Sequence, residues 1–265
     1  MALRTSYVTF LTQADRPLSV AGKLNTVTCA GDDGAGRSPA VVICHGSDGV
    51  DGRGDFHAAA LNAAGIATLE IDMWAARGTA RGAAARPRSP IETLPDAFAA
   101  KAFLAAQPEI DPGRIGVMGF SWGGVVSLLA AGRSVQRLSG GTPAFRGHVA
   151  LYPVCWAYET VPGLSLADLT GAPVLIQAGD ADAYDDPDGL DQLLARLPPE
   201  SRAIVRGVTH AGAGHGFDRD LPAQTINDPF AHKGKGGPVR MQFHPEAARA
   251  ARDLAVDFFR ETLRG

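Results

Sequence analysis

The sequence predicts an α/β fold in which a mostly parallel sheet is covered by helices on both faces. Strand-like and helix-like segments alternate from residue 40 to the end of the chain, which is the rhythm of parallel βα units. The segment 40–44 is apolar throughout, as expected when both faces of a strand are buried. The 265 residues, 45% of them hydrophobic, suffice for one large core, so we expect a single domain over residues 1–265.

The elements follow from local patterns. Residues 5–29 predict two antiparallel edge strands around a turn at 13–17, and glycines and aspartates predict a second turn at 31–36. Further strands are expected at 40–44, 66–71, 115–118, 148–152, 173–178 and 203–208. Helices are expected at 56–64, 94–107, 125–131, 188–197 and 245–263. The segment 75–92 is expected to be a long loop, and 111–114 a turn into the next strand.

The most informative motif is Gly119-Phe120-Ser121-Trp122-Gly123-Gly124. It follows an apolar strand and precedes a helical segment, and a strand, a Gly-x-Ser-x-Gly turn and a helix make a nucleophile elbow. The two flanking glycines match a turn too tight for bulky neighbours. We therefore expect Ser121 to be a covalent nucleophile.

Two further side chains follow strands on the same edge of the predicted sheet. Asp182 comes after the strand at 173–178, with Asp180 as the alternative, and His215 comes after the strand at 203–208. The order Ser, Asp, His is that of the α/β-hydrolase triad. In this interpretation His215 takes the serine proton and Asp182 orients the imidazole. The backbone amides of Trp122 and Ser47 are the expected oxyanion donors.

Composition excludes several classes of partner. The net charge is −3 with no polybasic tract, which argues against nucleic acid and anionic membranes. No 18-residue apolar run and no hydrophobic signal core are present, and Cys29, Cys44 and Cys155 suggest buried reduced thiols, so a cytoplasmic location is expected. His210, His215 and Asp218 do not have the spacing of a metal site, so no metal is expected.

With these residues in place, the chain resembles the dienelactone hydrolase family of α/β-hydrolases over roughly residues 40–260. The resemblance rests on His45-Gly46 with Gly49, the elbow, Gly179-Asp180-Ala181-Asp182 and the segment 212–217. It implies hydrolysis of a small ester or lactone without a cofactor. The founding members carry cysteine at the position of Ser121 and glutamate at that of Gly46. These two differences favour a serine esterase over a dienelactone hydrolase in the strict sense.

The resemblance also implies an arginine that binds a substrate carboxylate. Arg77 is the expected match and Arg81 the alternative, although Arg77, Arg81, Arg86 and Arg88 together also fit a solvated loop. Trp74, Trp122 and Trp156 are candidates for an acyl pocket or for core packing, and His45 either binds substrate or holds its own loop. The insertion 218–243 is expected to be irregular and is a candidate lid or subunit contact.

Three alternatives stay open at this stage. The same triad serves peptidases and amidases, and a catalytically silent scaffold would keep the fold for binding alone. The sequence does not distinguish a monomer from a homodimer.

Overall fold

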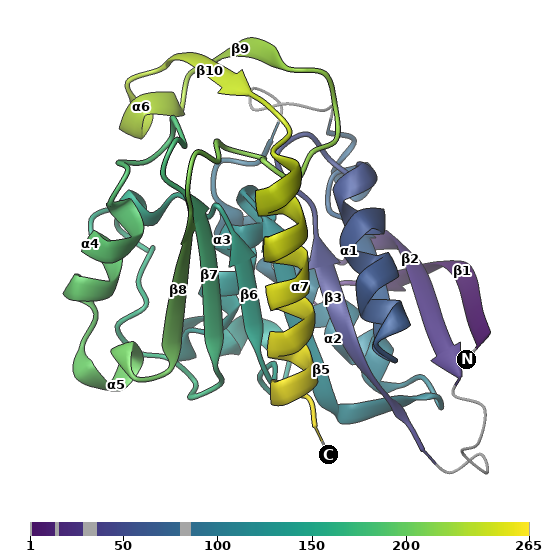
Figure 1. Ribbon diagram of the computed structural model, residues 1–265. Coiled ribbons are helices and arrows are strands. Elements are labelled where there is room, and N and C mark those ends of the chain that lie inside the picture. Colours follow the sequence, from purple (N-terminus) through teal and green to yellow (C-terminus); the bar gives the residue numbers. More distant parts are fainter. Residues whose placement is uncertain (1, 14–15, 29–35, 80–85, 265) are drawn as a thin grey trace.

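The centre of the protein is a twisted sheet of eight strands in the order β1-β2-β4-β3-β5-β6-β7-β8 (Figure 1). The computed structural model describes residues 2–13, 16–28, 36–79 and 86–264. The strands are β1 (Ala2–Leu11), β2 (Ser19–Thr28), β3 (Ser38–Cys44), β4 (Ala67–Asp72), β5 (Ile110–Phe120), β6 (His148–Leu151), β7 (Val174–Gly179) and β8 (Val205–His210). From β4 to β8 every pairing is parallel, and β1 and β2 form an antiparallel edge. The predicted α/β fold class is confirmed, including its antiparallel N-terminal strands.

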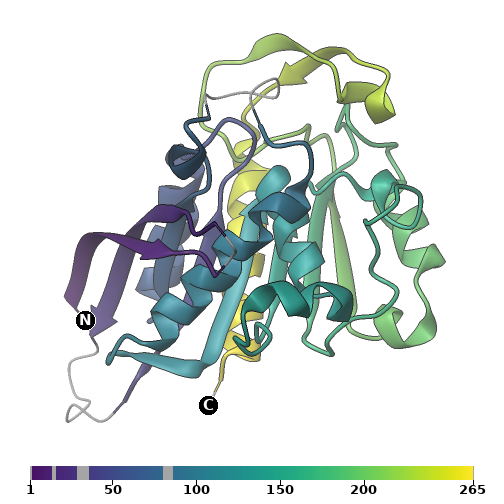
Figure 2. The ribbon, with the colours of Figure 1, turned by 180° about the vertical axis from the view of Figure 1, so that it is seen from behind.

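Helices cover both faces of this sheet. They are α1 (Gly52–Ala63), α2 (Leu94–Ala105), α3 (Trp122–Ala130), α4 (Gly189–Arg196), α5 (Pro199–Arg202), α6 (Ala231–Gly234) and α7 (Pro245–Thr262), with short 3₁₀ turns η1 (Ala75–Arg77), η2 (Pro90–Thr93), η3 (Arg133–Ser139) and η4 (Cys155–Ala157). Helices α1 and α7 lie on the face toward the viewer in Figure 1, and α2 and α3 lie on the opposite face, seen in Figure 2.

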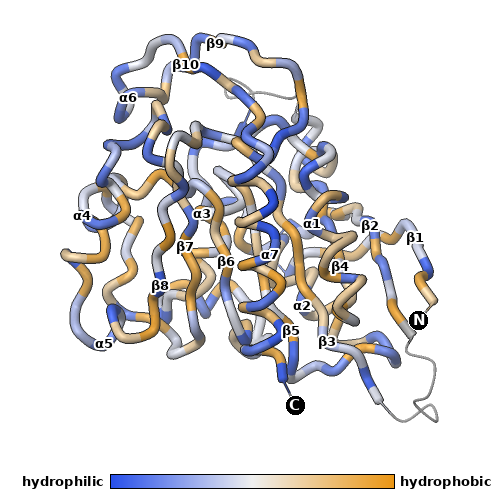
Figure 3. The backbone as a smooth tube through the Cα atoms, in the orientation of Figure 1, coloured by the Kyte–Doolittle hydropathy of each residue, from blue (hydrophilic) through white to orange (hydrophobic). Residues whose placement is uncertain are grey.

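The central strands are buried on both faces, which explains their continuous apolar sequences. In β3, Val42 packs into the cluster of α2 and α3, whereas its neighbours Val41 and Ile43 pack into that of α1 and α7. Figure 3 shows the same pattern as hydrophobic strands in the interior and hydrophilic segments outside. The two apolar clusters thus lie on opposite faces of the sheet.

Two local expectations were wrong in their boundaries. Helix α1 begins at Gly52 and not at residue 56, because the Asp51 side chain accepts a hydrogen bond from the Arg53 amide at 3.1 Å and caps the helix. The turn expected at 111–114 lies within β5, where the pairing register with β3 shifts between Ser38 and Ala40. The turn expected at 31–36 lies largely outside the described residues, as does Cys29.

The insertion 218–243 contains regular structure, contrary to the expectation. Strands β9 (Gln224–Asp228) and β10 (Gly237–Met241) form an antiparallel hairpin with α6 between them. The hairpin lies above the carboxyl ends of the sheet in Figure 1. The Tyr184 hydroxyl donates to Asp228 at 2.8 Å, and the His232 amide donates to the Ala183 carbonyl at 2.8 Å. The hairpin is therefore attached to the loop that follows β7.

Candidate active site

Ser121 lies at a strained turn between β5 and α3. Its backbone angles are φ 50° and ψ −111°, a region that non-glycine residues rarely adopt. A Cβ atom at Gly123 would lie 2.0 Å from the carbonyl oxygen of Cys44, and one at Gly119 would lie 2.2 Å from Gly123. The turn therefore requires glycine on both sides, as the motif predicted, and it holds the serine at the N-terminus of α3.

The structure brings Ser121, His215 and Asp182 into one hydrogen-bonded line. His215 Nε2 lies 2.9 Å from Ser121 Oγ, and His215 Nδ1 lies 2.7 Å from Asp182 Oδ2. The carboxylate accepts from Nδ1–H, which leaves Nε2 as an acceptor for the serine hydroxyl. The second oxygen of Asp182 accepts from the Tyr184 amide at 2.8 Å. Asp180, the alternative acid, accepts instead from the Gly212 amide at 2.6 Å and belongs to a turn.

Aromatic rings enclose the imidazole of His215. The ring of Tyr152 lies edge-on at a centroid distance of 4.9 Å, and that of Tyr184 is tilted at 4.2 Å. His215 and Asp182 are only 6% and 7% exposed. Because the pair is shielded from water, the charge of the carboxylate acts on the imidazole more strongly than it would in solvent.

The two expected oxyanion residues belong to the start of α3 and to the loop after β3. Trp122 is the first residue of α3, so its amide is among those that have no partner within the helix. Ser47 follows β3, and its carbonyl accepts from the Trp74 indole at 3.1 Å. The Trp122 indole donates to Thr93 Oγ1 at 3.1 Å, and its ring contacts that of Trp74 edge-on at 5.6 Å. Trp74 thus holds the loop of Ser47 in place.

His45 supports the same loop and has no ring nitrogen left for a substrate. Its Nδ1–H donates to the Gly46 carbonyl at 2.8 Å, and Nε2 accepts from the Met73 amide at 2.9 Å. Burial lowers its pKa to about 4, so the ring is neutral. Of the two interpretations considered for His45, these contacts favour the structural one.

Arg77, the expected ligand of a substrate carboxylate, is bound by groups of the protein itself. Its guanidinium donates to both oxygens of Asp96, at 2.6 and 3.0 Å, and to two backbone carbonyls. Asp96 is fully buried and needs this partner, because an unpaired carboxylate there would be costly. The alternative, Arg81, lies outside the described residues.

Arg86 is the described loop arginine that reaches the site. Its Nη1 donates to Ser47 Oγ at 2.9 Å, and its guanidinium lies over the rings of Trp122, at 5.0 Å, and Phe230, at 3.9 Å. No carboxylate among residues 2–13, 16–28, 36–79 and 86–264 forms an ion pair with it. Burial lowers the pKa of the group, although an arginine remains charged at neutral pH. The position of Arg86 could not be predicted from the sequence, because the path of so long a loop does not follow from residue spacing.

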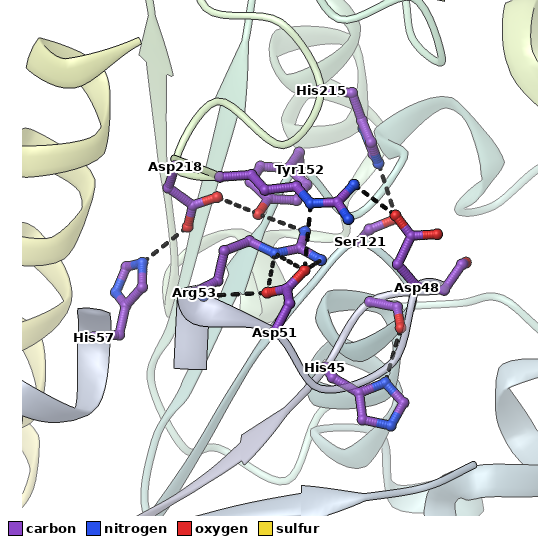
Figure 4. A network of polar contacts seen from close by, with 12 residues as sticks. His45, Asp48, Asp51, Arg53, His57, Ser121, Tyr152, His215 and Asp218 are labelled. Carbon is purple, nitrogen blue, oxygen red and sulfur yellow. Dashed lines mark hydrogen bonds and ion pairs between the residues drawn. The ribbon is translucent and has the colours of Figure 1, made fainter. Parts of the chain in front are cut away.

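A buried polar network lies beside His215 and was missed by the sequence analysis (Figure 4). Arg53 is 4% exposed and donates to both oxygens of Asp51, at 2.9 and 2.7 Å. It also contacts the Tyr152 hydroxyl, which donates to Asp218 at 2.5 Å, and His57 lies 2.9 Å from the other oxygen of Asp218.

Electrostatics keep the centre of this network charged. Burial opposes ionisation of Asp218, but hydrogen bonding and electrostatic attraction from His57, Arg53 and Tyr152 hold its pKa below the usual value. Arg219, the next residue, donates to Asp48 at 2.6 Å and so connects the loop of His215 to the loop of Ser47. The sequence signal for this network is weak: Asp218 and Arg219 directly follow the segment 212–217 that contains His215, and Asp48 directly follows Ser47.

Neither a metal site nor a membrane span is found in the described part of the chain. No three His, Cys, Asp or Glu side chains there are arranged to hold an ion, and His210 contacts Gln177 at 3.0 Å. No helix there has the length and hydropathy needed to cross a bilayer.

Known proteins place the chain in a family. The model of the dienelactone hydrolase family matches residues 26–263. Two uncharacterised proteins of Mycobacterium tuberculosis are 29% identical over 189 residues, which is 66% of this chain and 64% of theirs. The chain therefore matches somewhat less than two thirds of their length.

Two further comparisons agree. A Bradyrhizobium protein named a probable 2-oxo-3-(5-oxofuran-2-ylidene)propanoate lactonase is 29% identical over 196 residues, 69% of this chain and 74% of that protein. The structure of Thermogutta terrifontis esterase 2 phosphorylated by paraoxon superposes with a TM-score of 0.66, at 15% identity, over 97% of this chain and 94% of that one. The chain belongs to the dienelactone hydrolase family.

Proposed function

We propose that this protein is a serine hydrolase that cleaves a carboxylic ester or a lactone through an acyl-enzyme. The observation that carries the proposal is the continuous line from Ser121 Oγ through His215 to Asp182, with contacts of 2.9 and 2.7 Å. A hydroxyl next to a neutral imidazole that is oriented by a carboxylate is an activated nucleophile.

The reaction divides into two transfers. Ser121 Oγ attacks the carbonyl carbon while His215 Nε2 takes the hydroxyl proton. The tetrahedral intermediate collapses, the bond to the alkoxy oxygen breaks, and His215 returns the proton to that oxygen. In a lactone the released alcohol stays part of the acyl group. Water then attacks the acyl-enzyme by the reverse proton path and regenerates the serine.

The oxyanion of each intermediate is assigned to the amides of Ser47 and Trp122. Trp122 suits this role because it directly follows Ser121 and its amide lies at the positive end of the α3 dipole. Ser47 suits this role because its peptide group is held in one orientation. Trp74 donates to its carbonyl, and Arg86 donates to its hydroxyl. Losing one donor of this kind costs about 3 kcal/mol of transition-state stabilisation.

We further propose that the acyl part of the substrate carries a carboxylate that pairs with Arg86. The guanidinium forms no ion pair with an acidic side chain of the described residues, although the Asp228 carboxylate attracts it, and it contacts Ser47 and Trp122. The name of the Bradyrhizobium relative describes a compound with an oxofuran ring and a propanoate group, which combines a lactone with an anion.

Replacing Ser121 by alanine tests the reaction class. We expect Ser121→Ala to reduce hydrolysis of p-nitrophenyl acetate to the level of buffer and to abolish labelling by a fluorophosphonate, with an unchanged melting temperature. Activity equal to wild type would exclude the mechanism. A wild-type protein that neither turns over esters nor reacts with the probe would be a silent scaffold, and faster cleavage of amides than of matched esters would indicate an amidase.

Replacing Arg86 by methionine tests the acyl charge. We expect Arg86→Met to lower kcat/KM for a mono-ester of a dicarboxylic acid by about 10- to 100-fold, the value of one charged hydrogen bond. The loss for the neutral methyl diester should be less than threefold. Arg88→Met, at an exposed position, is the control. Equal losses on both substrates would mean that Arg86 only positions Ser47.

A further inference from the structure

The strand β1 forms an open edge of the central sheet. It pairs with β2 along its whole length in one antiparallel register that does not shift, and the order of the sheet places no other described strand beside it. Figure 1 shows β1 at the outer edge of the sheet, beyond α1. Within residues 3–11, every second residue of such a strand directs its N–H and C=O away from the sheet, where another strand can bind them.

One face of β1 packs on the protein and the other face is exposed. The Phe10 ring stacks on that of Phe103 in α2 at a centroid distance of 5.3 Å, so the even-numbered residues face α2. Tyr7 lies opposite Lys23, whose ammonium contacts Asp55 of α1 at 2.6 Å, so the odd-numbered residues lie on the side of α1. The odd-numbered side chains are all exposed, and they are Leu3, Thr5, Tyr7, Thr9 and Leu11.

This exposed face is rich in apolar side chains and carries no charge. Five large hydrophobic residues are exposed in the described part of the chain, and three of them lie here, with exposed fractions of 58% for Leu3, 84% for Tyr7 and 65% for Leu11. Natural proteins protect an edge strand with lysine, proline or a bulge. The strand β1 has no lysine, no proline and no shift of register, whereas the opposite edge strand β8 is shorter and includes Arg206. An edge without such protection points to a partner strand.

The side chains of this face follow the same order in both directions. From residue 3 to residue 11 they are Leu, Thr, Tyr, Thr and Leu. If two copies of β1 pair antiparallel about Tyr7, Leu3 lies opposite Leu11 of the second copy. Thr5 then lies opposite Thr9, and the two Tyr7 side chains lie opposite each other. Pairs of apolar, aromatic and threonine side chains stabilise neighbouring strands, and a two-fold interface needs a surface that is complementary to itself.

We propose that this chain forms a two-fold dimer in which β1 pairs antiparallel with β1 of a second copy, centred on Tyr7. The two sheets then become one continuous sheet. Arg4 is the one charged residue of β1 and lies opposite Phe10 in this register, so no like charges meet. The pairing occupies the open edge of both copies, and the assembly therefore closes at two chains.

Sedimentation velocity of the full chain and of two matched double variants tests the proposal. We expect wild type to reach the mass of two chains, and no larger species, at about 100 μM protein. Leu3→Lys/Leu11→Lys places like charges opposite each other at both ends of the strand pair and should raise the Kd of the dimer by about tenfold or more. Leu3→Glu/Leu11→Lys removes the same two apolar side chains but places opposite charges there. Its Kd should be lower than that of the double-lysine variant by about tenfold or more.

Controls separate this interface from other effects of the substitutions. Leu221→Lys removes a side chain that is 47% exposed and lies outside β1, so it should associate like wild type. Thermal unfolding checks that each variant is folded. A single-chain mass for wild type at the highest concentration, an equal Kd for the two double variants, or an assembly larger than two chains would overturn the proposal. Ser121→Ala should dimerise like wild type, so the result is independent of the proposed hydrolase activity.

Discussion

At the residue scale, strained backbone conformations gather at the carboxyl ends of the central strands. Ser121 follows β5, and Tyr152 and Val154 follow β6, with φ values of 50°, 40° and 63°. Each conformation costs on the order of 1–3 kcal/mol and persists only where the surroundings enforce it. At Ser121 the elbow enforces it, and at Tyr152 the bonds of its hydroxyl to Asp218 and Arg53 contribute.

Tyr152→Phe should therefore separate the contribution of the hydroxyl to stability from the contact of the ring with His215. The change leaves the ring against His215 but removes a buried partner of Asp218, so unfolding should cost about 1–3 kcal/mol less. Because the ring contact remains, kcat should fall less than tenfold. Urea unfolding and ester kinetics measure the two effects. Tyr7→Phe, at an exposed position, is the control, and an unchanged stability of Tyr152→Phe would show that the network contributes little.

At the scale of elements, the elbow is a close contact between two backbone segments. The first turn of α3 approaches the end of β3, and Gly123 is the residue that allows the approach. The end of β3 cannot move away from α3, because β3 is hydrogen-bonded to β4 on one side and to β5 on the other. Ser121 and the loop of Ser47 are held together by this contact.

Gly123→Ala should be severely destabilising. Its Cβ atom would lie 2.0 Å from the Cys44 carbonyl oxygen and 2.7 Å from that of His45, both backbone atoms. We expect a loss of at least about 3 kcal/mol, or no soluble folded protein. Gly52→Ala is the matched control, because nothing lies within 4 Å of a Cβ atom there. Thermal unfolding compares the two, and a Gly123→Ala protein as stable as Gly52→Ala would refute the contact.

At the scale of the whole molecule, the loop between β3 and α1 is bound to the loop that contains His215. Residues 45–51 follow β3 and include Ser47, which contacts Trp74 and Arg86, and Asp48, which pairs with Arg219. The same loop ends with Asp51, which pairs with Arg53. Two ion pairs therefore hold this loop, the one with Arg53 buried and the one with Arg219 partly exposed.

Stability should fall as pH rises through the Glu70 titration. Burial raises the pKa of this carboxyl in the folded protein to about 8, above the unfolded value of 4.5, so the folded state binds the extra proton between these values. The penalty is absent below pH 4.5, grows through this window and is complete above pH 8, on the order of 5 kcal/mol. Glu70→Gln should lose this part of the pH dependence in urea unfolding at pH 5 and 8.5. Parallel curves for both proteins would contradict the assignment.

The sequence predicted the fold class and the order of the strands along the chain because both depend on local periodicity and on turn residues. It also selected Ser121, Asp182 and His215, since side chains that follow parallel strands share one edge of the sheet. It did not place Arg77 or Arg86. Both belong to a long loop, where the partner that a charge finds depends on the path of the chain and not on spacing.

What the sequence determined by itself is thus the sheet, its two covered faces and the glycine-flanked serine, all of which follow from short-range patterns. Only the tertiary structure decided which arginine contacts Ser47 and Trp122, that His45 is used by backbone groups, and that Glu70 Oε1 is buried without a hydrogen-bond partner among the described residues. These outcomes depend on which polar groups are desolvated together in the folded protein and on which hydrogen-bond partners then lie close enough to them. Such competition is settled between residues distant in the chain.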